Sequence, residues 1–373
     1  MSVMPDAAFA GGNILVEAAD GNEMRLRPDL RDTEGHWFYW QFRLRNPEPG
    51  SYGFVFDRRA LGVRGPGVSE DGGATWRWLG AGSGDGSFRY EAAAGVREAR
   101  FSFGMPYVQA DFERFLARWR GDDRLVADTL CSSRKGRPVE RIRFGRLTGT
   151  PAARVLLTCR HHACEMMANY VLEGLAEEVL SDSEAGRCLQ RNIEFAAIPF
   201  VDKDGVEDGD QGKNRRPHDH GQDYGLDTVY PEPAALRAWA PAWLDGVPAC
   251  ALDLHCPGPR GRFHEVVLFP CRVRSPENWR RMAPFFAALE TVQSGALDYR
   301  QADGEEFSTW DGKPYRAPER LRGYSAWAET LPGMRFAAPL EIPYANARGR
   351  EVNQTTARQF GRDLARALHA VFA

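Results

Sequence analysis

Residues 153–180 read ARVLLTCRHHACEMMANYVLEGLAEEVL, and this stretch decides the fold of the longer part of the chain. Its first seven residues are mostly apolar and too few for a surface helix, which predicts a buried strand. From Met166 onward the apolar residues recur at helical spacing and predict a helix. IEFAAIPFV (193–201) and ACALDLHC (249–256) predict two more buried strands of the same kind.

Amphipathic helices are predicted between and after these strands. One apolar stripe lies in 276–292 and consists of Trp279, Met282, Phe286 and Leu289. A second lies in 353–372 and consists of Ala357, Phe360, Leu364, Leu368 and Val371. Apolar strands that alternate with such helices predict an α/β domain with a mostly parallel or mixed sheet. We assign residues 106–373 to this domain.

The first hundred residues have a different hydrophobic pattern, because their apolar residues alternate with period 2. In HWFYWQFRLRN (36–46) the alternation puts Phe38, Trp40, Phe42 and Leu44 on one face and Tyr39, Gln41, Arg43 and Arg45 on the other. Turn signals separate the runs, with NPEPGS at 46–51 and EDGG at 70–73. Short alternating strands between such turns predict an antiparallel β-sandwich. We assign residues 1–105 to it.

Composition and charge exclude few classes of function but give some direction. The 373 residues carry a net charge of −3, which is not the basic excess expected of a nucleic-acid binder. No apolar run approaches the roughly 18 residues that span a bilayer, and the N-terminus does not resemble a secretory signal. Reduced thiols in the cytoplasm are expected from the odd number of cysteines: 131, 159, 164, 188, 250, 256 and 271.

Histidine and carboxylate side chains follow two of the predicted strands at the point where each ends. His161, His162 and Glu165 follow the strand at 153–159, and His255 ends the strand at 249–256. Ligand sites of α/β sheets gather at such strand ends, and a catalytic zinc takes three nitrogen or oxygen ligands and an open position. We therefore expect one zinc ion bound by His162, Glu165 and His255. His161 is the nearest competitor, and Asp253 is expected to orient a ligand.

RHHACEM (160–166), YVLEG (170–174) and DLHC (253–256) resemble motifs of the zinc carboxypeptidases, most closely the cytosolic branch that contains the tubulin deglutamylases. Ala163 and Cys164 stand where that branch has Pro and Gly. A β-sandwich joined to the catalytic domain by a segment like FSFGMPYVQADFERFL (101–116) is also similar to that branch. The resemblance implies a zinc-dependent carboxypeptidase that acts on peptide or protein C-termini.

The resemblance also implies roles for residues outside the metal set. A glutamate on a late strand is the general base in that family, and Glu341 in AAPLEIPYANARG (337–349) matches it, with Glu265 as the next choice. An arginine polarises the scissile carbonyl, and Arg215 or Arg216 matches it. Tyr324 matches the mobile tyrosine that closes over the substrate.

The polar segment 201–225 departs from the family at the residues that grip the substrate carboxylate. The family carries Asp-x-Asn-Arg there, whereas Gly221 and Gln222 stand in the places of Asn and Arg. Losing a charge-assisted pair to a carboxylate costs roughly 1.5–3 kcal/mol. Alternatively, Asn214 and Arg215 form the carboxylate pair, and Arg216 remains for the carbonyl.

Three functions remain open from the sequence. The first is a zinc carboxypeptidase with Glu341 as base and Arg215 as the oxyanion donor. The second, motivated by Gly221 and Gln222, is a zinc amidase or deacylase on substrates without a free carboxylate. The third is a peptide-binding protein that has lost turnover. The substrate's residue preference and the oligomeric state do not follow from the sequence.

Overall fold

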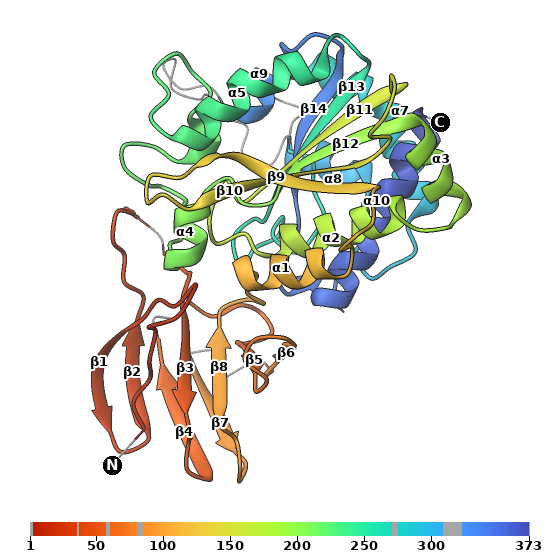
Figure 1. The fold of residues 1–373 in the computed structure, drawn as a ribbon. Helices are drawn as coiled ribbons and strands as arrows, with labels where there is room; N and C mark the ends of the chain where they lie inside the picture. The colour runs from red at the N-terminus through yellow and green to blue at the C-terminus, as the bar shows by residue number, and fades with distance from the viewer. Residues whose placement is uncertain are drawn as a thin grey trace.

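The computed structural model describes residues 3–35, 37–56, 60–80, 86–270, 275–308 and 323–372. Its N-terminal strands form two four-stranded sheets, which lie below a larger α/β part in Figure 1. The first sheet has the order β1 (Leu15–Asp20), β2 (Glu23–Arg27), β4 (Gly50–Val55), β7 (Ser87–Ala92). The second has the order β3 (Gln41–Arg45), β8 (Glu98–Ser102), β5 (Gly67–Ser69), β6 (Arg77–Trp78).

These sheets confirm the predicted β-rich N-terminal part, with two differences in detail. The pair β2–β4 is parallel, while the other strand pairs of both sheets are antiparallel. The alternation predicted around β3 holds on one face, where the Phe42 ring centroid lies 5.0 Å from that of Phe54 and 5.1 Å from that of Phe101. The opposite face is also buried, because the segment before β1 covers it. There the Tyr39 hydroxyl donates to the carbonyl of Gly11 (2.6 Å).

The larger part is built on a sheet of six strands, which is mixed, as the sequence predicts. Its order is β14 (Met334–Glu341), β13 (Ala249–His255), β11 (Ala153–Cys159), β12 (Ile193–Ile198), β10 (Pro138–Gly145), β9 (Leu125–Ser132). The first four strands are parallel to one another, and β10 and β9 are antiparallel to their neighbours. Three predicted strands are thus confirmed as adjacent members of the parallel group.

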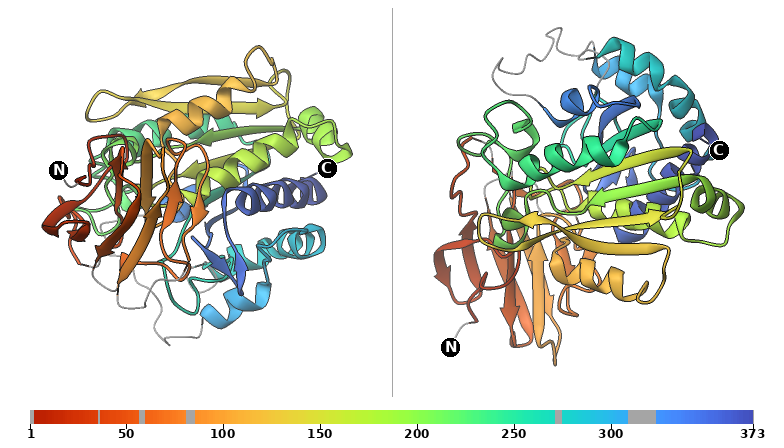
Figure 2. Two further views of the ribbon diagram at one scale, coloured as in Figure 1. Left: turned by 90° about the horizontal axis from the view of Figure 1, so that it is seen from below. Right: turned by 45° about the horizontal axis from the view of Figure 1, so that its top comes forward.

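Helices cover both faces of this sheet (Figures 1 and 2). One face packs on α2 (Met167–Val179) and α10 (Gln354–Phe372), and the other on α5 (Pro231–Leu244) and α9 (Tyr324–Ala328). Strand β11 is buried on both sides, because Val155 and Leu157 join the first core and Leu156 joins the second. Helices α2 and α10 cross very closely, since a Cβ on Gly174 would lie 1.9 Å from the carbonyl oxygen of Arg358.

The remaining described elements are short, apart from three helices, which have 9 or 10 residues each. They are α1 (Gln109–Ala117), α3 (Glu184–Asn192), α4 (Lys203–Asp208), η2 (His220–Gln222), α6 (Pro276–Arg281), α7 (Ala283–Val292), α8 (Gln301–Phe307), β15 (Asn346–Ala347) and β16 (Arg350–Glu351). The single helix predicted at 276–292 is therefore two helices with a break at Met282. Pro284 explains the break, because proline lacks the amide hydrogen that a continuous helix requires.

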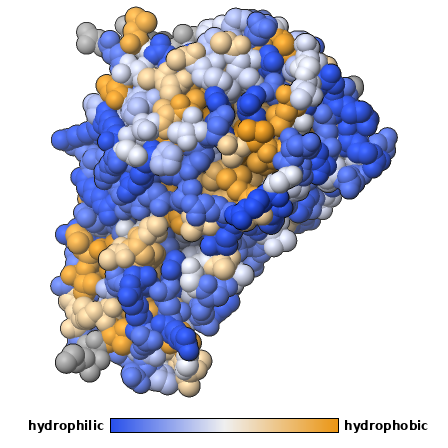
Figure 3. Space-filling model, viewed as in Figure 1, coloured by the Kyte–Doolittle hydropathy of each residue, from blue (hydrophilic) through white to orange (hydrophobic). Residues whose placement is uncertain are grey.

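The surface of the face shown in Figure 3 is mainly hydrophilic with scattered apolar patches. Large exposed apolar side chains among the described residues include Leu226, at 95% exposure. Among the residues that the structure describes, no helix is long and apolar enough to cross a membrane. Six of the cysteines are free thiols in this structure, and Cys271 lies outside the described residues.

Candidate metal centre

Three parallel strands end side by side and place the candidate residues at one edge of the sheet. His255, the last residue of β13, pairs in register with Glu341, the last residue of β14. On the other side, Asp253 of β13 pairs with Thr158 of β11. The turn that follows β11 therefore brings His162 and Glu165 next to His255, as the strand-end argument predicts.

A buried arginine shapes the turn between β11 and α2. Arg160 has a positive φ of 64°, a conformation that costs a non-glycine residue about 1 kcal/mol. Its guanidinium donates to the carbonyls of Ala163 and Tyr107 and to the Asn169 side chain, the latter two at 2.8 Å. These bonds offset the strain and fix the direction in which His162 and Glu165 leave the sheet.

Glu165 lies at the centre of the candidate site and is fully buried. Its Oε1 is 2.9 Å from Nδ1 of His162, and its Oε2 is 2.7 Å from Nδ1 of His255. The ammonium of Lys213 also lies 2.7 Å from Oε1. Burial alone would raise the pKa of Glu165, but Lys213 and the two histidines lower it well below its usual range.

A second carboxylate lies behind each of the two imidazoles, hydrogen-bonded to His255 and at ion-pair distance from His162. Nε2 of His255 is 2.6 Å from Asp253, and Nε2 of His162 is 3.6 Å from Asp219. Burial opposes protonation of both histidines, but the carboxylates outweigh it: they raise the pKa of His162 to about 9 and that of His255 well above its usual value. Such outer carboxylates orient metal-bound histidines in many proteins. Both Nδ1 atoms thus face Glu165, with the ring orientations fixed.

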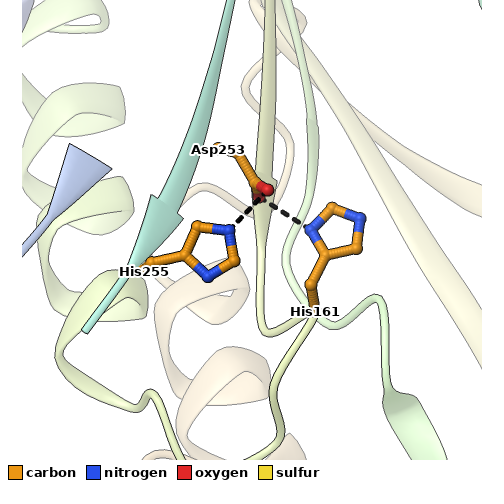
Figure 4. A group of neighbouring side chains, drawn as sticks. All are labelled: His161, Asp253 and His255. Carbon is orange, nitrogen blue, oxygen red and sulfur yellow. Dashed lines mark hydrogen bonds and ion pairs between the residues drawn. The ribbon is translucent and has the colours of Figure 1, made fainter. Parts of the chain in front are cut away.

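A second group that could hold a metal shares His255 with the first (Figure 4). In this group Asp253 lies between two imidazoles, 2.7 Å from Nδ1 of His161 and 2.6 Å from Nε2 of His255. The other nitrogen of His161 is bonded to the hydroxyl of Tyr224 at 2.7 Å, and burial lowers the pKa of His161. His161 is thus a neutral, fully enclosed side chain with both nitrogens paired.

The first group fits a catalytic metal better than the second. In each group the potential ligand atoms lie within 4.8 Å of one another. Only His162, Glu165 and His255 combine two oriented imidazole nitrogens and a carboxylate with partial exposure, because His162 is half-buried. A catalytic zinc takes such a set and keeps one position open. The structure brings together all three residues predicted as ligands.

Glu341 lies beside this group, at the end of β14. Its backbone pairs with Leu268, and its Oε2 is buried with no hydrogen-bond partner within the described ranges. A buried carboxylate oxygen without a partner is costly, so its retention next to the candidate metal ligands points to a chemical role. Glu265, the alternative, accepts a hydrogen bond from the Asn346 amide (2.6 Å).

Arg215 lies in a different environment from the one predicted. Its guanidinium donates hydrogen bonds to Asp202 and Asp210 (2.7 Å each) and forms an ion pair with Asp32, whose carboxylate is 2.9 Å from Nε. The side chain is buried, so the prediction of a free oxyanion donor does not fit its position. Asn214 and Arg216 are exposed, and Arg216 pairs with Glu34.

The cation that does reach the site is Lys213, which the sequence argument missed. Its ammonium contacts Glu165 and also donates to the carbonyl of Cys256 at 2.7 Å. Burial would lower the pKa of Lys213, but Glu165 raises it above its usual value, so it is charged. In the sequence Lys213 is only a lysine in a polar loop. Where its side chain points depends on the contacts that hold this loop, which the sequence does not show.

Gln222 and Tyr324, the other two residues predicted to contact the substrate, lie in different surroundings. Gln222 ends η2, and its Oε1 is buried without a hydrogen-bond partner among the residues described. Its side-chain amide lies against Gly323, within 3.8 Å of the position a Cβ would take there. Tyr324 is only 2% exposed, with its ring 5.1 Å from that of His161 and 5.2 Å from that of Tyr224. It is a packed side chain and is not placed to close over a substrate.

Comparison with known proteins gives one match to a family and several to solved structures. The family model described as zinc carboxypeptidase matches residues 120–230, which contain His162 and Glu165 but neither His255 nor Glu341. An uncharacterized protein of Zymomonas mobilis is 25% identical over 216 residues, or 55% of each chain. The present chain thus spans about half the length of that relative.

The solved structures match over nearly the whole chain. A metallo-carboxypeptidase of Pseudomonas aeruginosa, in complex with (2-guanidinoethylmercapto)succinic acid, has a TM-score of 0.78 and 20% identity, covering 99% of this chain and 98% of that one. A metallo-carboxypeptidase of Burkholderia cenocepacia has a TM-score of 0.76 and 18% identity, with complete coverage of both chains. At these identities the likeness establishes a shared fold, N-terminal sheets included.

Proposed function

We propose that this chain, whose residues 120–230 match the zinc carboxypeptidase family, is a metallocarboxypeptidase that cleaves C-terminal residues from peptides or proteins. The observation that carries the proposal is the position of Glu165 between Nδ1 of His162 and Nδ1 of His255, at the ends of parallel strands. The metal would be one zinc ion per chain, held by these three residues. We place the activity in the cytoplasm, with no nucleic-acid or membrane partner.

A zinc ion in such a site polarises the substrate carbonyl and lowers the pKa of its bound water. The protein's own task is to orient the ligands, and Asp253 and Asp219 do so through the far nitrogens of the two histidines. Because the hydrogen bond to Asp253 anchors the His255 ring, little ordering entropy is lost when this ligand binds.

Glu341 is proposed as the general base. Its buried Oε2 lacks a described hydrogen-bond partner and is therefore free to accept a proton at that atom and to deliver it to the leaving amine. Its place beside His255 in the sheet register keeps it at the metal group throughout the reaction.

Lys213 is proposed as the cation that stabilises the negative charge developing on the scissile carbonyl oxygen. Preorganised positive charge in a partly buried site is among the strongest contributions to catalysis. This assignment replaces Arg215, whose nitrogen groups are taken by Asp202, Asp210 and Asp32.

A second candidate function follows from Gln222. A neutral amide with a buried oxygen that lacks a described partner stands where the family has its carboxylate-binding arginine. Such a residue favours a neutral substrate group over a carboxylate, so an amidase or deacylase acting on substrates without a free C-terminal carboxylate is the alternative. A peptide-binding protein without turnover is the remaining outcome.

The test is a panel of matched peptides, each prepared as the free acid and as the C-terminal amide, assayed with the zinc-loaded protein. Turnover confined to free acids supports the carboxypeptidase, and turnover of amides supports the alternative. Binding of peptides without turnover of either class, in a protein with stoichiometric zinc, would contradict both enzymatic functions.

A further inference from the structure

Residues 207–216, the last two residues of α4 and the loop that follows, are here called the Lys213 loop and lie between the N-terminal part of the chain and the candidate metal centre. The outer side of the loop pairs with residues 31–35. Thr33 and Arg215 form an antiparallel bridge, the amide of Glu34 donates to the carbonyl of Asn214 (3.2 Å), and the amide of Arg216 donates to the carbonyl of Asp32 (3.1 Å). These contacts join the loop to the N-terminal segment through one isolated β-bridge and the two hydrogen bonds beside it.

Side chains of the N-terminal part secure the same loop at further points. Asn13 donates to the carbonyl of Gly209 (2.8 Å), and Arg31 pairs with Asp210 (2.6 Å). The side-chain oxygen of Gln211 accepts from the amide of Phe38 (2.7 Å). The loop is therefore held by backbone and side-chain contacts along most of its length.

The inner side of the loop faces the metal centre. The carbonyl of Gln211 accepts from the amide of Cys164 at 3.0 Å, directly before Glu165. Gly212 has a φ of +80°, and a Cβ there would lie 2.4 Å from the amide nitrogen of Ala163. The next residue is Lys213, whose ammonium contacts Glu165. A shift of the loop would thus move Lys213 directly.

We propose that residues 31–35 position Lys213 for catalysis, and that Arg215 is the positioning residue through which they act. Arg215 joins the two sides, because it binds Asp32 of the N-terminal segment together with Asp202 and Asp210 of the α/β part. The inference rests on the proposed role of Lys213. It gives the connection between β2 and β3 of the N-terminal part a role in the reaction beyond folding.

Two variants and one control distinguish an effect on the position of Lys213 from an effect on the folding of the protein. Arg215→Gln removes the charge that joins the three carboxylates, and Asp32→Ala removes only the most exposed of them, whose side chain is 44% exposed. The matched control is Arg64→Ala. Arg64 donates to Asn346 (3.0 Å) and to the carbonyl of Gly349 (2.9 Å), so it joins the same two parts of the chain away from the Lys213 loop.

Two measurements are made on the full-length, zinc-loaded protein. Hydrogen exchange followed by mass spectrometry should show faster exchange across 207–216 in both variants and no change there in the control. In steady-state assays kcat should fall by about 10- to 100-fold with KM nearly unchanged, because misplacing a catalytic group by about 1 Å has effects of this size. Unchanged exchange in both variants would overturn the proposal.

A double-mutant cycle with Lys213→Met decides whether Arg215 acts through Lys213. If it does, Arg215→Gln should lower kcat little further once Lys213 is gone. Additive losses, or faster loop exchange with unchanged kcat, would also overturn the proposal. If the wild-type protein hydrolyses no peptide, the proposed function fails, while the exchange measurement still decides whether residues 31–35 hold the loop.

Discussion

Two buried ionic clusters lie on either side of the Lys213 loop, and they are built with opposite charge. In one, the carboxylate of Glu165 is surrounded by His162, His255 and Lys213. In the other, the guanidinium of Arg215 is surrounded by the carboxylates of Asp202, Asp210 and Asp32. In both clusters the central side chain is buried, and groups of opposite charge or hydrogen-bonding partners surround it.

The difference lies in what surrounds the central group. The carboxylates around Arg215 pair with it directly and with other cations, as Asp210 does with Arg31. The histidines around Glu165 present Nδ1 to it and are held through Nε2, the arrangement of metal ligands. A buried cluster of charges is thus evidence for a site only when its atoms converge and are oriented from behind. We expect chemistry at the Glu165 cluster and positioning at the Arg215 cluster.

The largest expected effect is the loss of the metal. His162→Ala and His255→Ala should each abolish stoichiometric zinc binding, because two ligands do not retain a catalytic zinc. His161→Ala should lose much less, since His161 pairs with Tyr224 and Asp253. Metal analysis after gel filtration measures this. Asp210→Ala, in the other cluster, is the control and should keep its zinc, whereas a loss there would break the comparison.

Removing the base should have the next largest effect. Glu341→Gln keeps the shape of the side chain but cannot accept a proton, so kcat should fall by about 10²- to 10⁴-fold with zinc and melting temperature unchanged. Activity above about one tenth of wild type, measured on the same peptide, would move the base elsewhere, with Glu265 as the next candidate.

Lys213→Met should have the third largest effect. We expect kcat to fall by about 10²-fold, which is the usual effect of removing one oxyanion donor. The control is Arg216→Ala in the same loop, an exposed residue that should have little effect. Kinetics on one peptide compare the two. A larger loss in Arg216→Ala than in Lys213→Met would reverse the assignment.

A substitution that should improve activity tests whether the residue at position 222 contacts the substrate carboxylate. Gln222→Arg adds a guanidinium for the substrate carboxylate and should lower KM for free-acid peptides by about tenfold, or about 1.4 kcal/mol, while amidated peptides are unaffected. Gly221 is kept, because a Cβ there would lie 3.2 Å from Oδ1 of Asp219, which is tighter than an ordinary contact. Equal changes for both peptide classes would show that Gln222 does not contact the carboxylate.

The smallest expected effect is on the free energy of unfolding. It concerns the Arg215 cluster, in which Asp210 makes this free energy depend on pH. Burial and the neighbouring Asp202 raise the pKa of Asp210 to about 6 despite Arg215. A raised folded-state pKa contributes stability that is present below the unfolded value and is lost as the pH rises through about 6. The difference in the free energy of unfolding between wild type and Asp210→Asn should therefore shift by about 1 kcal/mol between pH 5 and 7 in denaturant titrations.

Much of the fold could be predicted from local patterns. The strand at 153–159 agrees with the structure residue for residue, because a short apolar run with a turn after it has few alternatives. The grouping of His162, Glu165 and His255 followed from the rule that parallel strands end at the same edge of a sheet. These are properties of single segments or of neighbouring strands.

The contacts of residues 213–216 could not be predicted in this way. Arg215 is a surface-type residue by pattern, and its burial depends on Asp32, a residue of the other part of the chain. Lys213 points to Glu165 only because the loop around it is held from outside. Tyr324 stands in a helix whose buried face meets His161 and Tyr224, which local sequence does not reveal.

The order of synthesis gives the pairing of residues 31–35 with the Lys213 loop a further meaning. The N-terminal sheets leave the ribosome first, and domains generally fold as units in that order. Residues 31–35 are thus in place before residues 207–216 are made, and the nascent loop meets a surface already formed. A chain without residues 31–35 would keep His162, Glu165 and His255 but would lack the segment that pairs with the Lys213 loop. Lys213 would then lose the outer support of the loop that carries it to Glu165.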